Sequence, residues 1–285
     1  MMRIRLGFSP CPNDTFIFHA MLNGLVETEG LEFDPVIADV EELNRTAFEK
    51  NIDVTKLSYF AFAHVINNYV LLNAGSALGN NCGPLLINKT GNISDPGKIK
   101  IAIPGKYTTA NFLLSIYSTE LKNKKELLFS EIEDAVISGD VDAGLIIHES
   151  RFTFQDKGLK KVVDLGEWWE KQFKLPIPLG GIAVNRGLNK IVQQKMDRIL
   201  KRSVAYAMEN PEASRDYVMK YSQELSDEVI NSHIKLYVNN YTLNLGEDGK
   251  KAIEFLISKA GDLNLITEYS YDLFVEPSND ISVSI

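Results

Sequence analysis

The sequence predicts an α/β protein in which two lobes enclose a ligand cleft. Short apolar segments that fit buried strands alternate with amphipathic segments that fit helices, the pattern of α/β folds. A polar, turn-rich segment at 88–98 interrupts this alternation, and a second α/β unit begins after it. Two Gly/Pro-rich segments, at 75–84 and 175–181, fit a chain that passes from one lobe to the other and back.

These features divide the chain of 285 residues into two domains of ordinary size. We expect residues 1–88 and 180–285 to form a discontinuous first α/β domain that includes the C-terminal helices. Residues 89–179 are then an inserted second α/β domain. This is the two-lobed layout of the periplasmic-binding-protein fold, which closes over a small ligand between its lobes.

The composition narrows the classes of partner. The chain has a net charge of −8 and a pI of about 5.2, so we expect neither nucleic acid nor a membrane as the main partner. No apolar run of about 18 residues is present, and Met1–Phe8 lacks a signal-peptide core, which predicts a cytoplasmic protein. Cys11 and Cys82 are too few for a disulfide framework or a zinc site, so we expect no metal and no cofactor. The oligomeric state stays open, and a monomer is compatible with the sequence.

The first strand should run into a rigid loop. Ile4, Leu6 and Phe8 alternate along Met1–Phe8, and Ser9-Pro-Cys-Pro-Asn-Asp-Thr-Phe16 follows. In this loop Asn13 or Asp14 should cap a helix that ends at Gly24. A helix N-terminus at the carboxyl end of a strand can bind an anion, although a rigid turn with a cap explains the same residues.

The next elements place polar groups at the end of another strand. We predict a strand at Leu31–Ile37, at an edge because of Pro35, then a helix at Glu41–Lys50. Asp53–Ser58 should be a strand that continues into a helix at Tyr59–Asn67. Lys56 and Ser58 could then meet an anionic ligand, or could be surface and capping residues. An apolar segment at Tyr69–Leu72 and a strand at Leu85–Ile87 complete this part.

The second unit begins with a candidate anion site. Ile99–Ile103 alternates as a strand that stops at Pro104-Gly105, and Lys106–Thr109 should cap the helix that follows. Free N–H groups and the helix dipole at such an end can hold a carboxylate, but a well-capped helix without a ligand fits equally. We also predict a short strand at Leu127–Phe129 and a capping box, Ser130–Glu133, that starts a helix ending near Gly139.

The stretch Gly139–Phe154 carries the strongest functional candidate. Its apolar run Leu145–Ile147 fits a buried strand of a parallel sheet that delivers His148 at its carboxyl end. Ligands bind at this edge of open α/β sheets, and a histidine with an ordinary pKa of about 6.5 exchanges a proton near neutrality. A structural or solvent-facing histidine fits the same pattern. Glu149 is the weaker candidate, because neighbouring side chains on a strand point to opposite faces.

The remaining residues are expected to be structural. Trp168 and Trp169, on a helix after a strand at Val162–Leu165, should pack in the core or between domains. Beyond Val184 the chain should be helical, with helices starting at Asn210-Pro211 and Ser226 and one over Glu247–Gly261. The other histidines have no polar neighbours in sequence and are expected to be surface or packing residues: His19, His64 and His233.

Four motifs in this order resemble those of the 1,4-dihydroxy-6-naphthoate synthases, which act in the futalosine pathway of menaquinone biosynthesis. The motifs are Ser9-Pro-Cys-Pro-Asn-Asp-Thr-Phe16, Thr55-Lys-Leu-Ser-Tyr59, Pro104-Gly-Lys-Tyr-Thr-Thr-Ala110 and Gly144-Leu-Ile-Ile-His-Glu-Ser-Arg-Phe-Thr153. The resemblance runs from Leu6 to beyond Tyr241. It implies a cytoplasmic carbon–carbon lyase on the type 2 periplasmic-binding-protein fold, which converts cyclic dehypoxanthine futalosine to 1,4-dihydroxy-6-naphthoate and releases dihydroxyacetone. Such a reaction requires no redox change and no metal.

The resemblance also implies roles for individual residues. The proton acceptor of the family corresponds to His148, and its substrate-contacting segments correspond to Lys56-Leu57-Ser58 and Thr109-Ala110. From the residues themselves, Ser9 and Asn13 in the first loop should face the same small carboxylate substrate. The exact roles of Ser9 and Asn13 stay open.

Two other functions fit the predicted fold. One is the chorismate dehydratase of the same pathway. The segment Ile147-His-Glu-Ser-Arg-Phe152 argues against this enzyme. The other is a non-enzymatic, cytoplasmic protein that binds a small anion. A histidine placed at the cleft favours chemistry over simple binding.

Overall fold

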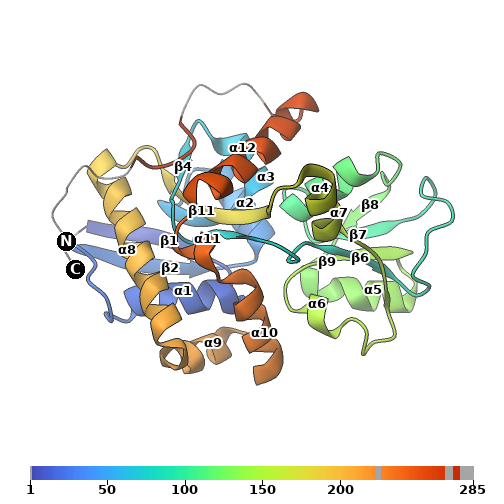
Figure 1. The fold of residues 1–285 in the computed structure, drawn as a ribbon, viewed down its shortest axis with the longest axis horizontal. Helices are drawn as coiled ribbons and strands as arrows, with labels where there is room; N and C mark the ends of the chain where they lie inside the picture. Colours follow the sequence, from blue (N-terminus) through green and yellow to red (C-terminus); the bar gives the residue numbers. More distant parts are fainter. Residues whose placement is uncertain (1, 223–225, 267–271, 277–285) are drawn as a thin grey trace.

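The computed structural model describes residues 2–222, 226–266 and 272–276, and it forms two lobes that are each built on one β-sheet (Figure 1). Helices alternate with strands in both lobes. This arrangement confirms the predicted α/β fold class.

The first sheet has the strand order β2-β1-β3-β11-β4, with β5 paired to β11. Its strands are β1 (Met2–Phe8), β2 (Leu31–Ile37), β3 (Val54–Ser58), β4 (Tyr69–Leu71), β5 (Ala77–Gly79) and β11 (Ile177–Asn185). β1 is parallel to β2 and β3, and β11 is antiparallel to β3. Pro35 lies in β2, which is the edge strand, as its missing N–H requires.

Eight α-helices of the described chain surround this sheet: α1 (Pro12–Leu22), α2 (Val40–Phe48), α3 (Tyr59–Val65), α8 (Lys190–Glu209), α9 (Arg215–Tyr221), α10 (Asp227–Tyr237), α11 (Asn240–Leu243) and α12 (Gly246–Asp262). α8 packs along α1, where the Ser203 hydroxyl donates to the Ile17 carbonyl at 2.6 Å and accepts from the Met21 N–H at 3.1 Å. α10 also contacts α1. The C-terminal part of the chain is thereby brought against the beginning of α1.

The second sheet has the order β10-β6-β9-β7-β8. Its elements are β6 (Leu85–Asn88), β7 (Ile101–Ile103), α4 (Thr109–Tyr117), β8 (Lys124–Glu126), α5 (Ile132–Ser138), β9 (Ala143–Ile146), α6 (Ser150–Thr153), β10 (Lys160–Asp164) and α7 (Leu165–Phe173). β9 is parallel to β7 but antiparallel to β6. The strand before His148 is therefore buried, as predicted, but it lies in a mixed sheet and not in a purely parallel one.

The chain changes sheets at two places. β5 is the last strand of the first sheet before the crossing, and β6 already pairs with β9 and β10 in the second. The change thus precedes Leu85, whereas the predicted boundary lay at residue 88. The chain returns between α7 and β11, whose first residue, Ile177, pairs with Gly79. Both crossings therefore lie beside each other, at β5 and β11.

Three local predictions were wrong. Leu127–Phe129 is not a strand: β8 pairs with β7 three residues earlier, and the buried Phe129 begins a 3-10 turn, Phe129–Glu131. The Ser130–Glu133 capping box is absent, because α5 begins at Ile132 without a side-chain cap. Asn13 and Asp14 do not cap α1, because the cap position is Cys11 and both residues lie in the first helical turn.

Trp169 joins the two lobes, which confirms its predicted packing role. Its side chain is fully buried on α7, its ring lies 5.7 Å from that of Phe255 on α12, and its Nε1–H donates to the Pro176 carbonyl at 3.2 Å. Trp168 is only half-buried and packs against Tyr117.

Replacing Trp169 by phenylalanine should lower the free energy of unfolding by about 1–3 kcal/mol, because the change leaves a cavity and a buried carbonyl without its donor. Urea unfolding followed by circular dichroism measures this loss. Trp168→Phe is the matched control and should cost clearly less. Equal losses for the two variants would contradict the assignment of Trp169 as the packing residue between the lobes.

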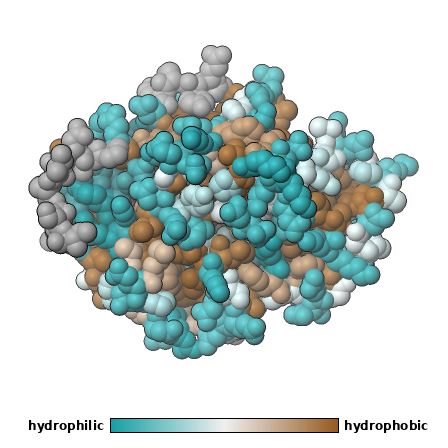
Figure 2. All heavy atoms as spheres, in the orientation of Figure 1, coloured by the Kyte–Doolittle hydropathy of each residue, from teal (hydrophilic) through white to brown (hydrophobic). Residues whose placement is uncertain are grey.

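The face shown in Figure 2 carries both hydrophilic and hydrophobic residues. On the side shown in Figure 2, hydrophilic side chains cover both lobes, and hydrophobic ones lie between them in smaller areas. Within the described residues, no helix has the length and apolarity needed to cross a membrane.

Candidate functional site

A cavity lies at the junction of the two lobes and is lined by residues of both. The first lobe contributes the loop before α1, the end of β3, and β11, and the second contributes the start of α4 and the turn after β9. All of the residues expected at a site from the sequence line it: Ser9, Asn13, Lys56, Leu57, Ser58, Thr109, Ala110 and His148. The fold therefore brings together segments that are up to about 140 residues apart in the sequence.

Asp14 organises the wall formed by the first lobe. Its carboxylate accepts from the Lys56 ammonium at 2.6 Å, from the Ser9 hydroxyl at 2.7 Å and from the Asn13 amide at 2.9 Å. Asp14 and Lys56 are both almost completely buried. Lys56 therefore faces the cavity as half of an ion pair and not as an isolated positive charge. The sequence suggested that Lys56 could bind an anionic ligand, but in the structure Asp14 already neutralises its charge.

Ser58 is held by Asn44, a fully buried residue of α2 that sequence reasoning did not identify. The side-chain oxygen of Asn44, Oδ1, accepts from the Ser58 N–H at 3.0 Å. The side-chain Nδ2 of Asn44 donates to the Ser58 hydroxyl at 3.3 Å. Because the hydroxyl accepts this hydrogen bond, its own proton can be donated into the cavity. Ser58 is thus a pre-positioned donor.

The start of α4 is the predicted anion cradle, and part of it is already used. The Tyr107 N–H donates to the Glu41 carboxylate of the first lobe at 3.1 Å, and the Thr109 hydroxyl donates to the Leu179 carbonyl at 2.7 Å. Thr108 caps the helix by accepting from the Asn111 N–H. The donors that α4 offers to the cavity are therefore the backbone N–H groups of Thr109 and Ala110, not the Thr109 hydroxyl.

His148 lies on a sharp turn, two residues beyond the end of β9. Its φ of 58° is in the left-handed region, which non-glycine residues seldom adopt and which is enriched at functional sites. Its Nε2 is buried and has no hydrogen-bond partner among the described residues. Burial lowers the pKa of His148 to about 4, Asp14 opposes this shift, and Lys56 adds to it. The imidazole is therefore neutral at pH 7 and has a nitrogen available for a proton.

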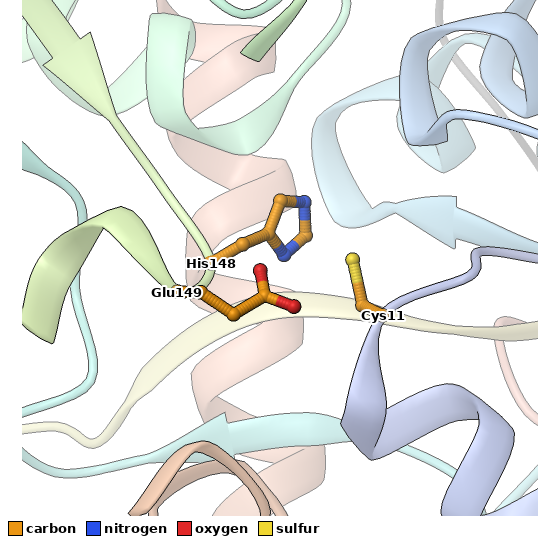
Figure 3. Close-up of side chains that lie close together, drawn as sticks. All are labelled: Cys11, His148 and Glu149. Carbon is orange, nitrogen blue, oxygen red and sulfur yellow. The ribbon is translucent and has the colours of Figure 1, made fainter. Parts of the chain in front are cut away.

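Glu149 and Cys11 lie beside the His148 ring (Figure 3). The turn at His148 breaks the alternation of a strand, so the carboxylate of Glu149 and the imidazole reach the same place, contrary to the prediction. Cys11 comes from the first lobe, at the start of α1. Burial raises the pKa of its thiol well above the usual value, and Glu149 raises it further.

His233 is a packing residue, which is one of the two roles expected for it, but its partners were not predicted from the sequence. It is fully buried on α10, and its ring stacks on that of His148 with centroids 6.3 Å apart. Its Nε2 lies 2.9 Å from the side-chain oxygen of Asn13, Oδ1, because the side-chain Nδ2 of Asn13 donates to Asp14. Since Oδ1 can only accept a hydrogen bond, Nε2 of His233 carries the proton. Nδ1 is then an unprotonated, buried nitrogen without a partner among the described residues. No local pattern around His233 marks this role, because Asn13 is 220 residues away.

The two histidines should make the protein sensitive to acid. Burial lowers the pKa of both His148 and His233 in the folded chain, whereas in the unfolded chain each is near 6.5. The unfolded chain therefore binds more protons below pH of about 6.5, and stability is lost as the pH falls toward the folded values. Melting temperatures should be level above neutrality and fall below it. His233→Phe should reduce this slope, and an unchanged slope would contradict the assignment.

The two lobes with a cavity between them have the fold of the periplasmic-binding proteins. A ligand-binding component of an ABC-type import system from Staphylococcus aureus has a TM-score of 0.71 at 16% identity, with 97% of each chain covered. An alkanesulfonate-binding protein from Xanthomonas axonopodis has a TM-score of 0.70 at 14% identity, covering 94% of this chain and 95% of its own. At these identities the likeness concerns the fold alone.

The chain belongs to the menaquinone biosynthesis family, whose model matches residues 4–262. It is 46% identical over 275 residues to a 1,4-dihydroxy-6-naphthoate synthase of Thermus thermophilus, covering 96% of this chain and all of the relative. It is 38% identical over 279 residues to the enzyme of the same name from Streptomyces coelicolor, covering 96% and 98%. A solved structure from Archaeoglobus fulgidus has a TM-score of 0.88 at 42% identity, covering 93% and 98%. The family predicted from the four motifs is confirmed.

Proposed function

We propose that this protein is a 1,4-dihydroxy-6-naphthoate synthase that converts cyclic dehypoxanthine futalosine to 1,4-dihydroxy-6-naphthoate and releases dihydroxyacetone. The observation that carries the proposal is His148, a neutral imidazole on a cavity between two lobes, whose Nε2 has no hydrogen-bond partner in the part of the chain that the structure describes. The names of the two curated relatives give the product, 1,4-dihydroxy-6-naphthoate, and support this proposal.

In this proposal His148 is the general base. Cleavage of a carbon–carbon bond with formation of an aromatic ring requires that a proton be removed from the substrate, and a positioned imidazole can accept it. Since Nε2 has no partner within the described part of the protein, it takes the proton without first giving up a hydrogen bond. The carboxylate of Glu149 beside the ring would stabilise the imidazolium that forms.

The substrate would be held by donors from both lobes. Its carboxylate fits the backbone N–H groups of Thr109 and Ala110 at the positive end of the α4 dipole. The Ser58 hydroxyl, positioned by Asn44, would donate from the opposite lobe. Lys56 and Ser9, which both donate hydrogen bonds to Asp14, would form a polar wall of the cavity. Leu57 would contribute an apolar surface. This division of roles agrees with a small carboxylate substrate, and we infer that the protein acts in the cytoplasm, where such biosynthesis occurs.

The test is to incubate the purified protein with cyclic dehypoxanthine futalosine and to follow the products by mass spectrometry. Formation of both 1,4-dihydroxy-6-naphthoate and dihydroxyacetone in equal amounts is the expected result. Chorismate, the substrate of the alternative dehydratase, serves as the control and should be returned unchanged. Turnover of chorismate alone would replace the proposal.

A second function is favoured by the fold, because solute-binding proteins share it. In that case the cavity would bind a small anion and leave it intact. Isothermal titration with cyclic dehypoxanthine futalosine separates the two: binding without product would support a carrier or sensor, whereas product formation supports the enzyme.

A further inference from the structure

Three metal-binding side chains meet at the junction of the lobes: Cys11, His148 and Glu149 (Figure 3). One donor atom of each lies within 4.8 Å of the donor atoms of the other two. Cys11 is at the start of α1 in the first lobe, and His148 and Glu149 follow β9 in the second. Cys11 and Glu149 are buried, and His148 is partly so. The cluster is therefore formed only when the lobes are together.

The donor set selects one class of cation. A thiolate sulfur, an imidazole nitrogen and a carboxylate oxygen are the three kinds of protein ligand that Zn²⁺ takes, whereas Mg²⁺ and Ca²⁺ prefer oxygen alone. Three protein ligands leave a fourth tetrahedral position, as in zinc sites that exchange a ligand. His148 lines the cavity, so this fourth position can be reached from it.

We propose that Cys11, His148 and Glu149 form a binding site for a thiophilic divalent cation, Zn²⁺ in particular, which competes with the substrate. The competition rests on the proposed function, because a cation on the His148 ring removes the base and stands in the cavity. The site itself rests only on the geometry. The cation would also hold the lobes together, since its ligands come from both.

The charges around the cluster suit a cation. Three carboxylate residues lie near enough to act on Cys11: burial is the main cause that raises the pKa of its thiol, and Glu149, Asp14 and Asp39 raise it further. Lys56 is the opposing positive charge at the cavity, and its ammonium is already paired with Asp14 at 2.6 Å. When the cation binds, a sulfur–metal bond forms and the thiol proton leaves to the solvent, so no oxidant or reductant is needed.

The direct test measures binding without substrate. Zn²⁺ is titrated into the wild-type protein against a chromophoric chelator, and Co²⁺ is added in parallel to report a sulfur ligand by its thiolate-to-metal charge-transfer band. One cation per chain and the charge-transfer band are expected. Cys11→Ser should abolish the band and weaken binding by at least about tenfold, the lower end of the cost of losing even an outer-shell partner.

The matched control is Cys82→Ser. Cys82 is the second buried cysteine of the chain; it lines the cavity but does not belong to the cluster. This variant should keep the band and the affinity. Glu149→Gln, which keeps the side chain's size, is the second variant and should weaken Zn²⁺ binding if Cys11→Ser fails to fold. No binding by the wild type, or equal binding by wild type and both cluster variants, would overturn the site.

Turnover is then measured separately with and without Zn²⁺. Inhibition that is relieved by excess substrate and by a chelator is expected. Zinc binding by a protein that forms no naphthoate would leave the site in place and contradict the proposed function. Turnover that saturating Zn²⁺ does not reduce would overturn the competition.

Discussion

Replacing His148 by alanine should lower the turnover of cyclic dehypoxanthine futalosine by about 10²- to 10⁴-fold, the range for loss of a general base. The imidazole is neutral at pH 7, and its Nε2 is buried without a partner in the described part of the chain. The donors proposed to hold the substrate lie elsewhere on the cavity wall, at Ser58 and at the start of α4. We therefore expect the loss mainly in kcat, with a small change in KM.

The pH profile distinguishes a base from a structural histidine. The wild-type kcat/KM should decline as the pH approaches about 4, the pKa of His148, because only the neutral imidazole accepts a proton. His148→Ala should lack this limb. His19→Ala is the control, since His19 lies on α1 against Tyr217 and does not line the cavity. Normal turnover by His148→Ala would remove His148 from the mechanism.

Replacing Asp14 by asparagine should lower the free energy of unfolding by about 3–5 kcal/mol, the cost of breaking a buried ion pair. The Lys56 ammonium, 2.6 Å from Asp14 and almost completely buried, would lose its charged partner. The Ser9 hydroxyl and the Asn13 amide lose a charged acceptor at the same time. Urea unfolding measures the loss.

Two further variants decide how this loss arises. Glu32→Gln breaks the exposed Arg3–Glu32 pair, whose atoms are 3.8 Å apart, and should cost no more than about 1 kcal/mol. In the double variant Asp14→Asn, Lys56→Met, the unpaired charge is removed as well, so part of the lost stability should return. A double variant that is less stable than Asp14→Asn alone would contradict the explanation by an unpaired charge.

Local sequence patterns predicted most elements because those elements depend on local physics. The strand Leu31–Ile37 has the predicted bounds, and Gly139 ends α5 with a φ of 88° that glycine adopts readily. The residues that line the cavity could also be named, because strand ends and helix starts carry polar side chains in recognisable places. His148, Ser58 and Thr109 all belong to this kind.

The missed features depend on contacts between distant segments. Whether Asp14 caps a helix or pairs with Lys56 is decided by how β3 lies beside the loop, and a cap signal contains no such information. Asn44 and His233 gain their roles only from partners in other elements. The cluster of Cys11, His148 and Glu149 likewise combines one residue of the first lobe with two of the second, and local sequence patterns do not reveal it.

The hydrogen bonds that tie α4 to the first lobe have a consequence for the speed of the reaction cycle. Thr109 bonds to Leu179 and Phe60, and Tyr107 bonds to Glu41, so each time the lobes separate these bonds must break. Opening of this kind limits turnover in many enzymes. The segment proposed to hold the substrate's carboxylate on one side would thus also influence, on the other, how long a finished product waits before it leaves.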